Sequence, residues 1–270
     1  MSVRTIAVVA GAVFKESVRD RVPYSMVAFA ALLIAASYLI SQLTAGQDLK
    51  IIKDLGLAAI SWFGLLIAVF IGIGLVSKEV ERRSVFGVLS KPISRGQFVL
   101  GKYFGLVMTL VVNLAVMTLA FYAVLFYLDV ITVPYAKTAW PAPAMDPRLG
   151  LAVILTVAEL MVVTAIALFF STFSSPLLSA LLTFGLWVTG HFNADLRNFE
   201  AVLDVAPLVW VARALYYLLP NLAPFNIRAE VVHGVAVPGS QILLTLAYAV
   251  VYIAILLAGA IAIFRRRDFK

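Results

Sequence analysis

The chain has 270 residues, of which 63% are hydrophobic and only 13% are charged. Soluble domains carry about 45–50% apolar and about 25% charged residues, so this composition excludes an ordinary soluble enzyme and predicts an all-α, polytopic membrane protein. The net charge of +7 suits nucleic-acid binding too, but in so apolar a chain it indicates cytoplasmic loops rich in lysine and arginine, and no nucleic-acid partner is expected. The lack of cysteine and the presence of only two histidines argue against disulfides, thiolate chemistry and a bound metal.

Residues 2–21 are predicted to form an amphipathic helix that lies on the membrane surface. Apolar residues recur there at helical spacing, and Lys15, Arg19 and Arg21 gather at its end, where lipid headgroups would meet them. A frayed terminus is the alternative. Pro23 is expected to break the helical pattern.

Six apolar runs follow, and each is predicted to cross the membrane as a helix, which needs about 20 apolar residues. The runs cover residues 24–43, 55–77, 103–127, 149–171, 176–193 and 241–264. The fifth run is short for a full crossing.

A long external segment, 194–240, separates the last two runs. Its part 206–225 is apolar, but three prolines interrupt it and Arg213 lies inside it. We therefore expect a re-entrant or interfacial helix that packs back onto the bundle like a lid, rather than a seventh crossing.

The distribution of charge favours six crossings with both termini in the cytoplasm. In that arrangement two thirds of the 21 lysine and arginine residues lie on the cytoplasmic side, as the positive-inside rule requires. A crossing at 206–225 would move Arg265, Arg266 and Arg267 to the outside. The sequence thus predicts a single transmembrane domain, residues 1–270, in the plasma membrane (the inner membrane of a bacterium).

The stretch 78–102 is the long charged segment between two apolar runs, and six of its residues are cationic. It contains a near-match to the phosphate-binding pattern G-x-x-x-x-G-K-[ST], from Gly96 to Lys102. Tyr103 replaces the Ser or Thr that would hold magnesium, and the pattern leads into a membrane helix. We expect this chain itself to bind no nucleotide and no other cofactor.

The same stretch is predicted to hold a short helix near 82–90 that a soluble partner grips. Its apolar side chains would form a ridge flanked by charges, Pro92 would end it, and Ser94 with Arg95 would begin the next helix. Such a ridge fits a groove in a partner, whereas a loop that only fixes topology would explain the cations alone. The docking residues expected are Glu79, Glu81, Arg82, Arg83, Val85, Phe86, Leu89, Lys91, Pro92 and Arg95.

Glu159 is the only acidic residue well inside an apolar run, so it is expected to face other helices or a wet cavity. Asn113 in the third run lies at similar depth, roughly 15 Å from the membrane surface at about 1.5 Å per residue, and a hydrogen bond between the two side chains is expected. Two roles for Glu159 stay open: a protonated side chain that joins helices, or a residue of a pathway or gate.

The second run carries Gly64, Ala68 and Gly72 at four-residue spacing, with Gly56 on the same line. Small residues aligned in this way let helix backbones approach closely. The row is expected to be a packing face, within the chain or between two copies. A chance arrangement is the alternative.

Three short motifs occur in order within the central stretch. They are Glu79-Val-Glu81-Arg82-Arg83, Leu89-Ser-Lys91-Pro92-Ile-Ser94-Arg95 and Leu100-Gly101-Lys102. With the amphipathic start, the six runs, an external Leu-Pro-Asn-Leu stretch and a basic tail, they resemble the ABC-2-type transporter permeases over nearly the whole chain. The Lys91-Pro92 turn is similar to that of permeases labelled as serving copper-enzyme maturation, whereas Ser84-Val85 stands where many members have Gly-Thr.

This resemblance implies the membrane subunit of an ATP-driven exporter. ATP and magnesium would be bound by a separate ABC ATP-binding subunit docked on 78–102, and a second permease copy would complete a homodimer. Scattered methionines and the lack of cysteine argue against direct copper transport. Two other functions stay open: an ion-coupled secondary transporter, which usually places several ionisable groups at mid-membrane, and a non-transporting scaffold that recruits a soluble partner.

Overall fold

The computed structural model describes residues 3–19, 21–41, 48–81, 94–138, 140, 142–192, 216 and 219–266, and within these ranges the fold is all-helical. The helices are α1 (Val3–Arg19), α2 (Arg21–Ser41), α3 (Asp48–Glu81), α5 (Arg95–Ile131), α6 (Pro134–Lys137), α7 (Arg148–Ser171), α8 (Pro176–His191), α11 (Arg228–Val232) and α12 (Gly239–Arg266), with a 3-10 turn, η2 (Ala223–Phe225).

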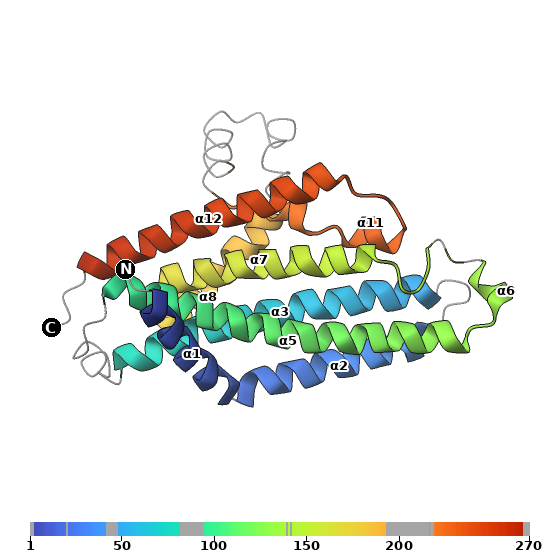
Figure 1. Cartoon of the computed structure of the whole chain (residues 1–270), viewed down its shortest axis with the longest axis horizontal. Helices are drawn as coiled ribbons and strands as arrows, with labels where there is room; N and C mark the ends of the chain where they lie inside the picture. Colours follow the sequence, from blue (N-terminus) through green and yellow to red (C-terminus); the bar gives the residue numbers. More distant parts are fainter. Residues whose placement is uncertain are drawn as a thin grey trace.

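The long helices run lengthwise beside one another, and α1 crosses α5 obliquely (Figure 1). The start of α1, the end of α3, the start of α5 and the end of α12 lie at one end of the bundle, which we call the α1 end (Figure 1). The helices α6 and α11 lie toward the opposite end, which we call the α11 end.

Each of the six predicted apolar runs coincides with a helix. Four helices are long and apolar enough to cross a membrane, over the windows Leu49–Gly72, Arg95–Ile131, Arg148–Ser171 and Gly239–Arg265. The helix α2 contains a shorter apolar stretch, Met26–Leu39, and α8 has 16 residues, in line with the short fifth run.

The helix boundaries have local causes. Ser94 caps α5: its hydroxyl accepts from the backbone N–H of Gln97, and the Gln97 side chain accepts from the backbone N–H of Ser94. The predicted start of this helix at Ser94 and Arg95 is therefore confirmed. Pro23 does not end a helix, because α2 begins at Arg21 and a proline in the first turn costs no intrahelical hydrogen bond.

The glycine row of α3 faces helices of the same chain. A Cβ added at Gly64 would come within 2.5 Å of Leu160 on α7, and one at Gly72 within 2.9 Å of Ala167 on the same helix. These close approaches place α3 against α7 with almost no side chain between the backbones.

The other two members of the row also face the interior of the same chain. Gly56 lies against the ring of Phe121 on α5, and Ala68 is buried in the main core. The row therefore packs within the chain, at the centre of a core built from α3, α5 and α7.

A second pair of glycines, Gly101 and Gly105, sets the crossing of α1 over α5, a contact that the sequence motifs do not predict. A Cβ at Gly101 would meet Val9 at 2.6 Å, and one at Gly105 would lie 2.7 Å from the carbonyl oxygen of Ala10 and from Val13. Only glycine at both positions lets α1 approach α5 this closely.

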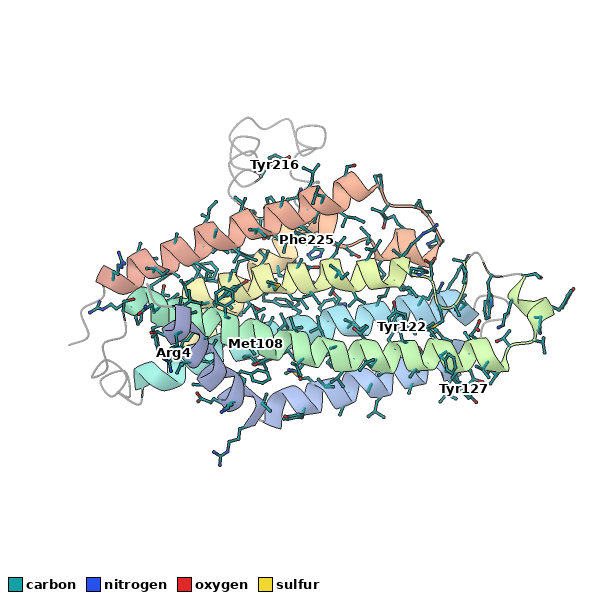
Figure 2. All side chains as sticks on the ribbon, viewed as in Figure 1. Arg4, Met108, Tyr122, Tyr127, Tyr216 and Phe225 are labelled. Carbon is teal, nitrogen blue, oxygen red and sulfur yellow. The ribbon has the colours of Figure 1, made fainter. Side chains whose placement is uncertain are left out.

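The described part of the external segment, 219–238, packs back onto the bundle. Leu222, Phe225 and Ile227 are buried in the main core, and the backbone N–H of Leu222 donates to the carbonyl oxygen of Gly190 at the end of α8. Phe225 lies between α7 and α12 (Figure 2). The rest of the predicted re-entrant or interfacial helix, up to residue 218 apart from Tyr216, lies outside the described residues.

Candidate functional site

The hairpin of α7 and α8 brings a buried carboxyl group next to two aromatic side chains. The turn between the two helices is held by hydrogen bonds within itself. The Ser174 hydroxyl donates to the carbonyl oxygen of Phe170 and lies 2.7 Å from the Ser179 hydroxyl. At about 1.5 Å per residue, Glu159 lies about 18 Å before the end of α7 and Trp187 about 16 Å after the start of α8, so the hairpin places them level.

Trp187 and His191 both contact one oxygen of Glu159. The indole Nε1 of Trp187 donates to Oε1 at 2.6 Å, and Nε2 of His191 lies 3.5 Å from the same oxygen. The two rings are themselves in contact, with centroids 4.7 Å apart. Because only 2% of Glu159 is exposed, these contacts are made in an environment that strengthens electrostatic interactions.

The same carboxyl group lines a cavity of about 30 Å³ on the side toward the α11 end. A water molecule needs roughly 10–15 Å³ of cavity volume, so the cavity has room for about two water molecules. Its walls come from α3, α7 and the turn before α11, and consist of Leu57, Ser61, Ala152, Thr156, Glu159, Phe225, Asn226, Ile227 and Arg228. The hydroxyl, amide and guanidinium groups among them make it a polar cavity within an apolar bundle.

An ion pair borders the cavity on its α11 side. Nε of Arg228 lies 2.9 Å from Oδ1 of Asp54 on α3, and both side chains are partly exposed. This pair ties the start of α11 to the start of α3, and so holds the segment after η2 over Glu159.

Two buried or half-buried cations fix the connections around this region. Nζ of Lys53 donates to the carbonyl oxygen of Pro143 at 2.7 Å, and only 1% of Lys53 is exposed. The guanidinium of Arg148 donates to the carbonyl oxygen of Gly234, and its backbone N–H donates to Asp146. The chain before α7 and the chain after α11 are thus both anchored to the long helices.

The predicted hydrogen bond between Asn113 and Glu159 is wrong. Nδ2 of Asn113 donates instead to the carbonyl oxygen of Thr109, one turn earlier in α5. Glu159 instead accepts a hydrogen bond from Trp187 on α8, because the tight hairpin places the indole N–H next to its carboxyl group.

The predicted docking residues fall into three groups. Arg82, Arg83, Val85, Phe86, Leu89, Lys91 and Pro92 lie outside the described residues. The helix α3 extends to Glu81, so Glu79 and Glu81 belong to its last turns. Arg95 is described, and it is the first residue of α5.

Arg95 makes specific contacts with the end of α12. Its Nη1 donates to the carbonyl oxygens of Phe264 at 3.1 Å and Arg265 at 2.9 Å. The rings of Phe98 and Phe264 stack beside it, with centroids 5.9 Å apart, and Nζ of Lys102 lies 4.8 Å from the Phe98 ring. The carbonyl groups that end a helix are short of donors, so Arg95 caps α12.

The sequence therefore points to Glu159 but not to its partners. Trp187, His191 and Arg228 carry no motif, and their roles depend on which helices are neighbours. The available signal was the short, uncharged turn between the fourth and fifth runs, which predicts an antiparallel hairpin and so a level partner for Glu159 on α8.

Among the described residues, no group of three or more histidine, aspartate or glutamate side chains could hold a metal ion. The cluster around Glu159 consists of one carboxyl group, one imidazole and one indole N–H.

A family model described as ABC-2 family transporter protein matches residues 7–269. No curated protein matches the sequence.

Proposed function

The chain belongs to the ABC-2 family of transporter proteins, and we propose that it is the permease of an exporter driven by a separate ATPase polypeptide. Membership makes it a multi-pass membrane protein and the permease component of an ABC transporter, whose partner is an ABC ATP-binding subunit. In the proposal that subunit binds ATP and magnesium, and this chain supplies the pathway. We propose export as the direction of transport because the motifs in 78–102 resemble those of ABC-2-type permeases.

The observation that carries the proposal is the convergence of elements at the α1 end. The stretch 78–102 begins in the last turns of α3 and ends in the first turns of α5. Arg95 joins that start of α5 to the end of α12, and Gly101 and Gly105 join it to α1. A partner that pushes on this stretch would therefore act on α3 and α5 directly and on α1 and α12 through them.

The cluster around Glu159 suits the outer part of the pathway in this proposal. It is the described site where a carboxyl group lines a polar cavity inside the bundle. The segment 219–238 covers it and is held by the Asp54–Arg228 pair, which is exposed enough to break without a large penalty.

The membrane arrangement in the proposal has six crossings, with α2 and α8 as the short ones, and both termini in the cytoplasm of a plasma membrane. The charge distribution supports it, because the basic stretch 78–102 and the basic end of α12 then share the cytoplasmic side. Two copies would form the transporter.

The test is purification of the whole chain in mild detergent, with an assay for ATP hydrolysis by what co-purifies. We expect an ABC ATP-binding subunit with the parent, and its loss from Phe86→Asp and Leu89→Asp, because a charge on the predicted ridge opposes burial in the partner's groove. Tyr135→Asp is the matched control: Tyr135 is 87% exposed on α6, toward the α11 end of the bundle, and this variant should keep the subunit. A parent that brings down no ATPase would refute the proposal.

A further inference from the structure

His191 lies between two oxygen atoms, one at each ring nitrogen. Nδ1 is 3.0 Å from the carbonyl oxygen of Trp187, and Nε2 is 3.5 Å from Oε1 of Glu159. A peptide carbonyl oxygen is an acceptor only, so an attractive contact requires the proton to be on Nδ1. This assigns the tautomer of the imidazole from its surroundings.

With its proton on Nδ1, a neutral imidazole presents the lone pair of Nε2 to Glu159. A lone pair facing an ionised carboxylate is repulsive, so the contact is favourable only with one more proton between the two groups. That proton sits on Nε2, giving an imidazolium–carboxylate pair, or on Glu159, giving a carboxylic acid that donates to Nε2. We propose that Glu159 and His191 together form a binding site for one exchangeable proton.

Both forms of the loaded site have no net charge, which suits a position inside an apolar bundle. Trp187 contributes to the balance between them, because its N–H donates to Oε1 and so stabilises the ionised carboxyl group. An unloaded site would instead leave one negative charge among α3, α7 and α8.

The proton reaches this site from the cavity, which Glu159 lines. Water in the cavity can accept the proton from the pair and return it, and the side chains of Ser61, Thr156 and Asn226 can hold that water. In the described part of the chain, charged and titratable side chains of α3, α11 and α12 also lie near this region. Arg228 lines the cavity but is paired with Asp54 of α3, and Tyr248 of α12 contacts Phe225 while its hydroxyl accepts from the backbone of Asn221.

Occupancy of the site is linked to the position of α8. The loaded pair holds the end of α8 against α7, and the neighbouring Gly190 carbonyl oxygen accepts from Leu222 of the covering segment. Loss of the proton turns the contact repulsive and loosens both connections. Proton binding from the α11 end therefore stabilises the closed position of the segment over the cavity.

The chain offers a direct test because it has only two histidines. The variant His233→Gln leaves His191 as the single histidine, whose nitrogens are followed by NMR in the full chain, labelled with ¹⁵N-histidine and held in lipid nanodiscs. In the same samples, infrared spectroscopy detects a protonated buried carboxyl group. We expect at neutral pH either imidazolium signals, or the neutral Nδ1–H tautomer together with a protonated-carboxyl band that is absent from Glu159→Gln.

His233 is the matched control. Its Nδ1 lies 2.8 Å from the carbonyl oxygen of Ala229, one turn earlier, as in His191, but His233 follows the last residue of α11 and is exposed. In the variant His191→Gln, the His233 signals should be the same with and without the additional change Glu159→Gln. A neutral Nε2–H tautomer for His191 with no protonated-carboxyl band at any pH would overturn the proposal.

The result does not depend on an ATPase partner, since the titration is measured on the permease alone. If Glu159→Gln is not monodisperse, the titration of the single-histidine parent decides by itself. The proton site and the proposed export function can thus fail separately.

Discussion

Trp187 is the side chain that joins α8 most directly to Glu159. Its indole N–H makes a 2.6 Å hydrogen bond to a carboxyl group of which 2% is exposed. Its ring also contacts Trp62 of α3 edge-on, with centroids 5.1 Å apart. The residue therefore combines a polar contact to α7 with an aromatic contact to α3.

The variant Trp187→Phe should separate these two contributions. Phenylalanine keeps most of the ring but removes the N–H, which leaves a buried oxygen without that donor at a cost of about 1–3 kcal/mol. We expect a lower midpoint of thermal unfolding, measured by the loss of the monodisperse peak after heating in detergent. Trp62→Phe is the control: Trp62 is half-exposed, and its loss should change the midpoint much less. Equal effects of the two variants would show that ring packing, not the hydrogen bond, stabilises the site.

At the scale of elements, α5 is the helix on which the α1 end depends. It contacts α1, α2, α3, α7 and α12. Near its start the two glycines 101 and 105 let α1 cross it, while Arg95 caps α12. A displacement of the first turns of α5 therefore reaches the two terminal helices together.

The close crossing of α1 over α5 predicts that a large side chain at Gly105 lowers the thermal stability of the protein. The variant Gly105→Leu places a side chain where Ala10 and Val13 already lie, so α1 must shift, and overpacking of this kind costs about 1–3 kcal/mol. Gly185→Leu on α8 is the matched control, because a Cβ there meets nothing within 4 Å. Thermal unfolding in detergent should show a lower midpoint for the first and an unchanged or higher one for the second. A stable Gly105→Leu would mean that α1 is free to leave α5.

The cap on α12 predicts that Arg95 transmits movement rather than only contacting a partner. Arg95→Ala should keep the ATPase subunit bound but lower the rate at which the complex hydrolyses ATP by about two- to fivefold. This fold-change corresponds to the loss of a helix-end interaction worth roughly 0.3–1 kcal/mol. Arg95→Lys should restore the ATPase activity only in part, because an ammonium group lacks the fixed planar geometry with which the guanidinium directs both N–H bonds of Nη1 at the two carbonyl oxygens. Arg265→Ala is the control, since it keeps the backbone carbonyl that Arg95 binds. Parallel loss of binding and activity would instead make Arg95 a docking contact.

The sequence predicts elements of this fold better than their contacts. Each of the six apolar runs locates one helix, α2, α3, α5, α7, α8 or α12, because apolar length is a property of each segment alone. The partner of Glu159 is different: it depends on the register of α7 against α8, and Asn113 had the right depth but the wrong neighbour. Gly101 lies in the charged stretch, where the near-match to a phosphate motif offered another reason for glycine, and Gly105 lies in the third apolar run, so neither position predicted the close approach of α1.

At the scale of the whole molecule, the two ends of the bundle are chemically distinct. The α1 end holds the two described ends of the basic stretch 78–102 and the end of α12, whereas the α11 end carries the Asp54–Arg228 pair, Lys53 and Asp146 beneath the covering connections. The proposed orientation places the first end in the cytoplasm and the second outside. Because the chain has no cysteine, a single introduced thiol can report the side on which any position lies.

Two exposed positions suit this measurement, Val3 on α1 and Tyr135 on α6, which are 79% and 87% exposed and lie at opposite ends of the bundle. With three crossings between them, a membrane-impermeant thiol reagent added to intact cells should label Tyr135→Cys and spare Val3→Cys, and permeabilised cells should show labelling of both. The introduced side chains replace exposed ones, so neither should disturb packing. The reverse pattern would invert the orientation, and labelling of both positions in intact cells would mean that an even number of crossings separates them, which would rule out the six-span arrangement.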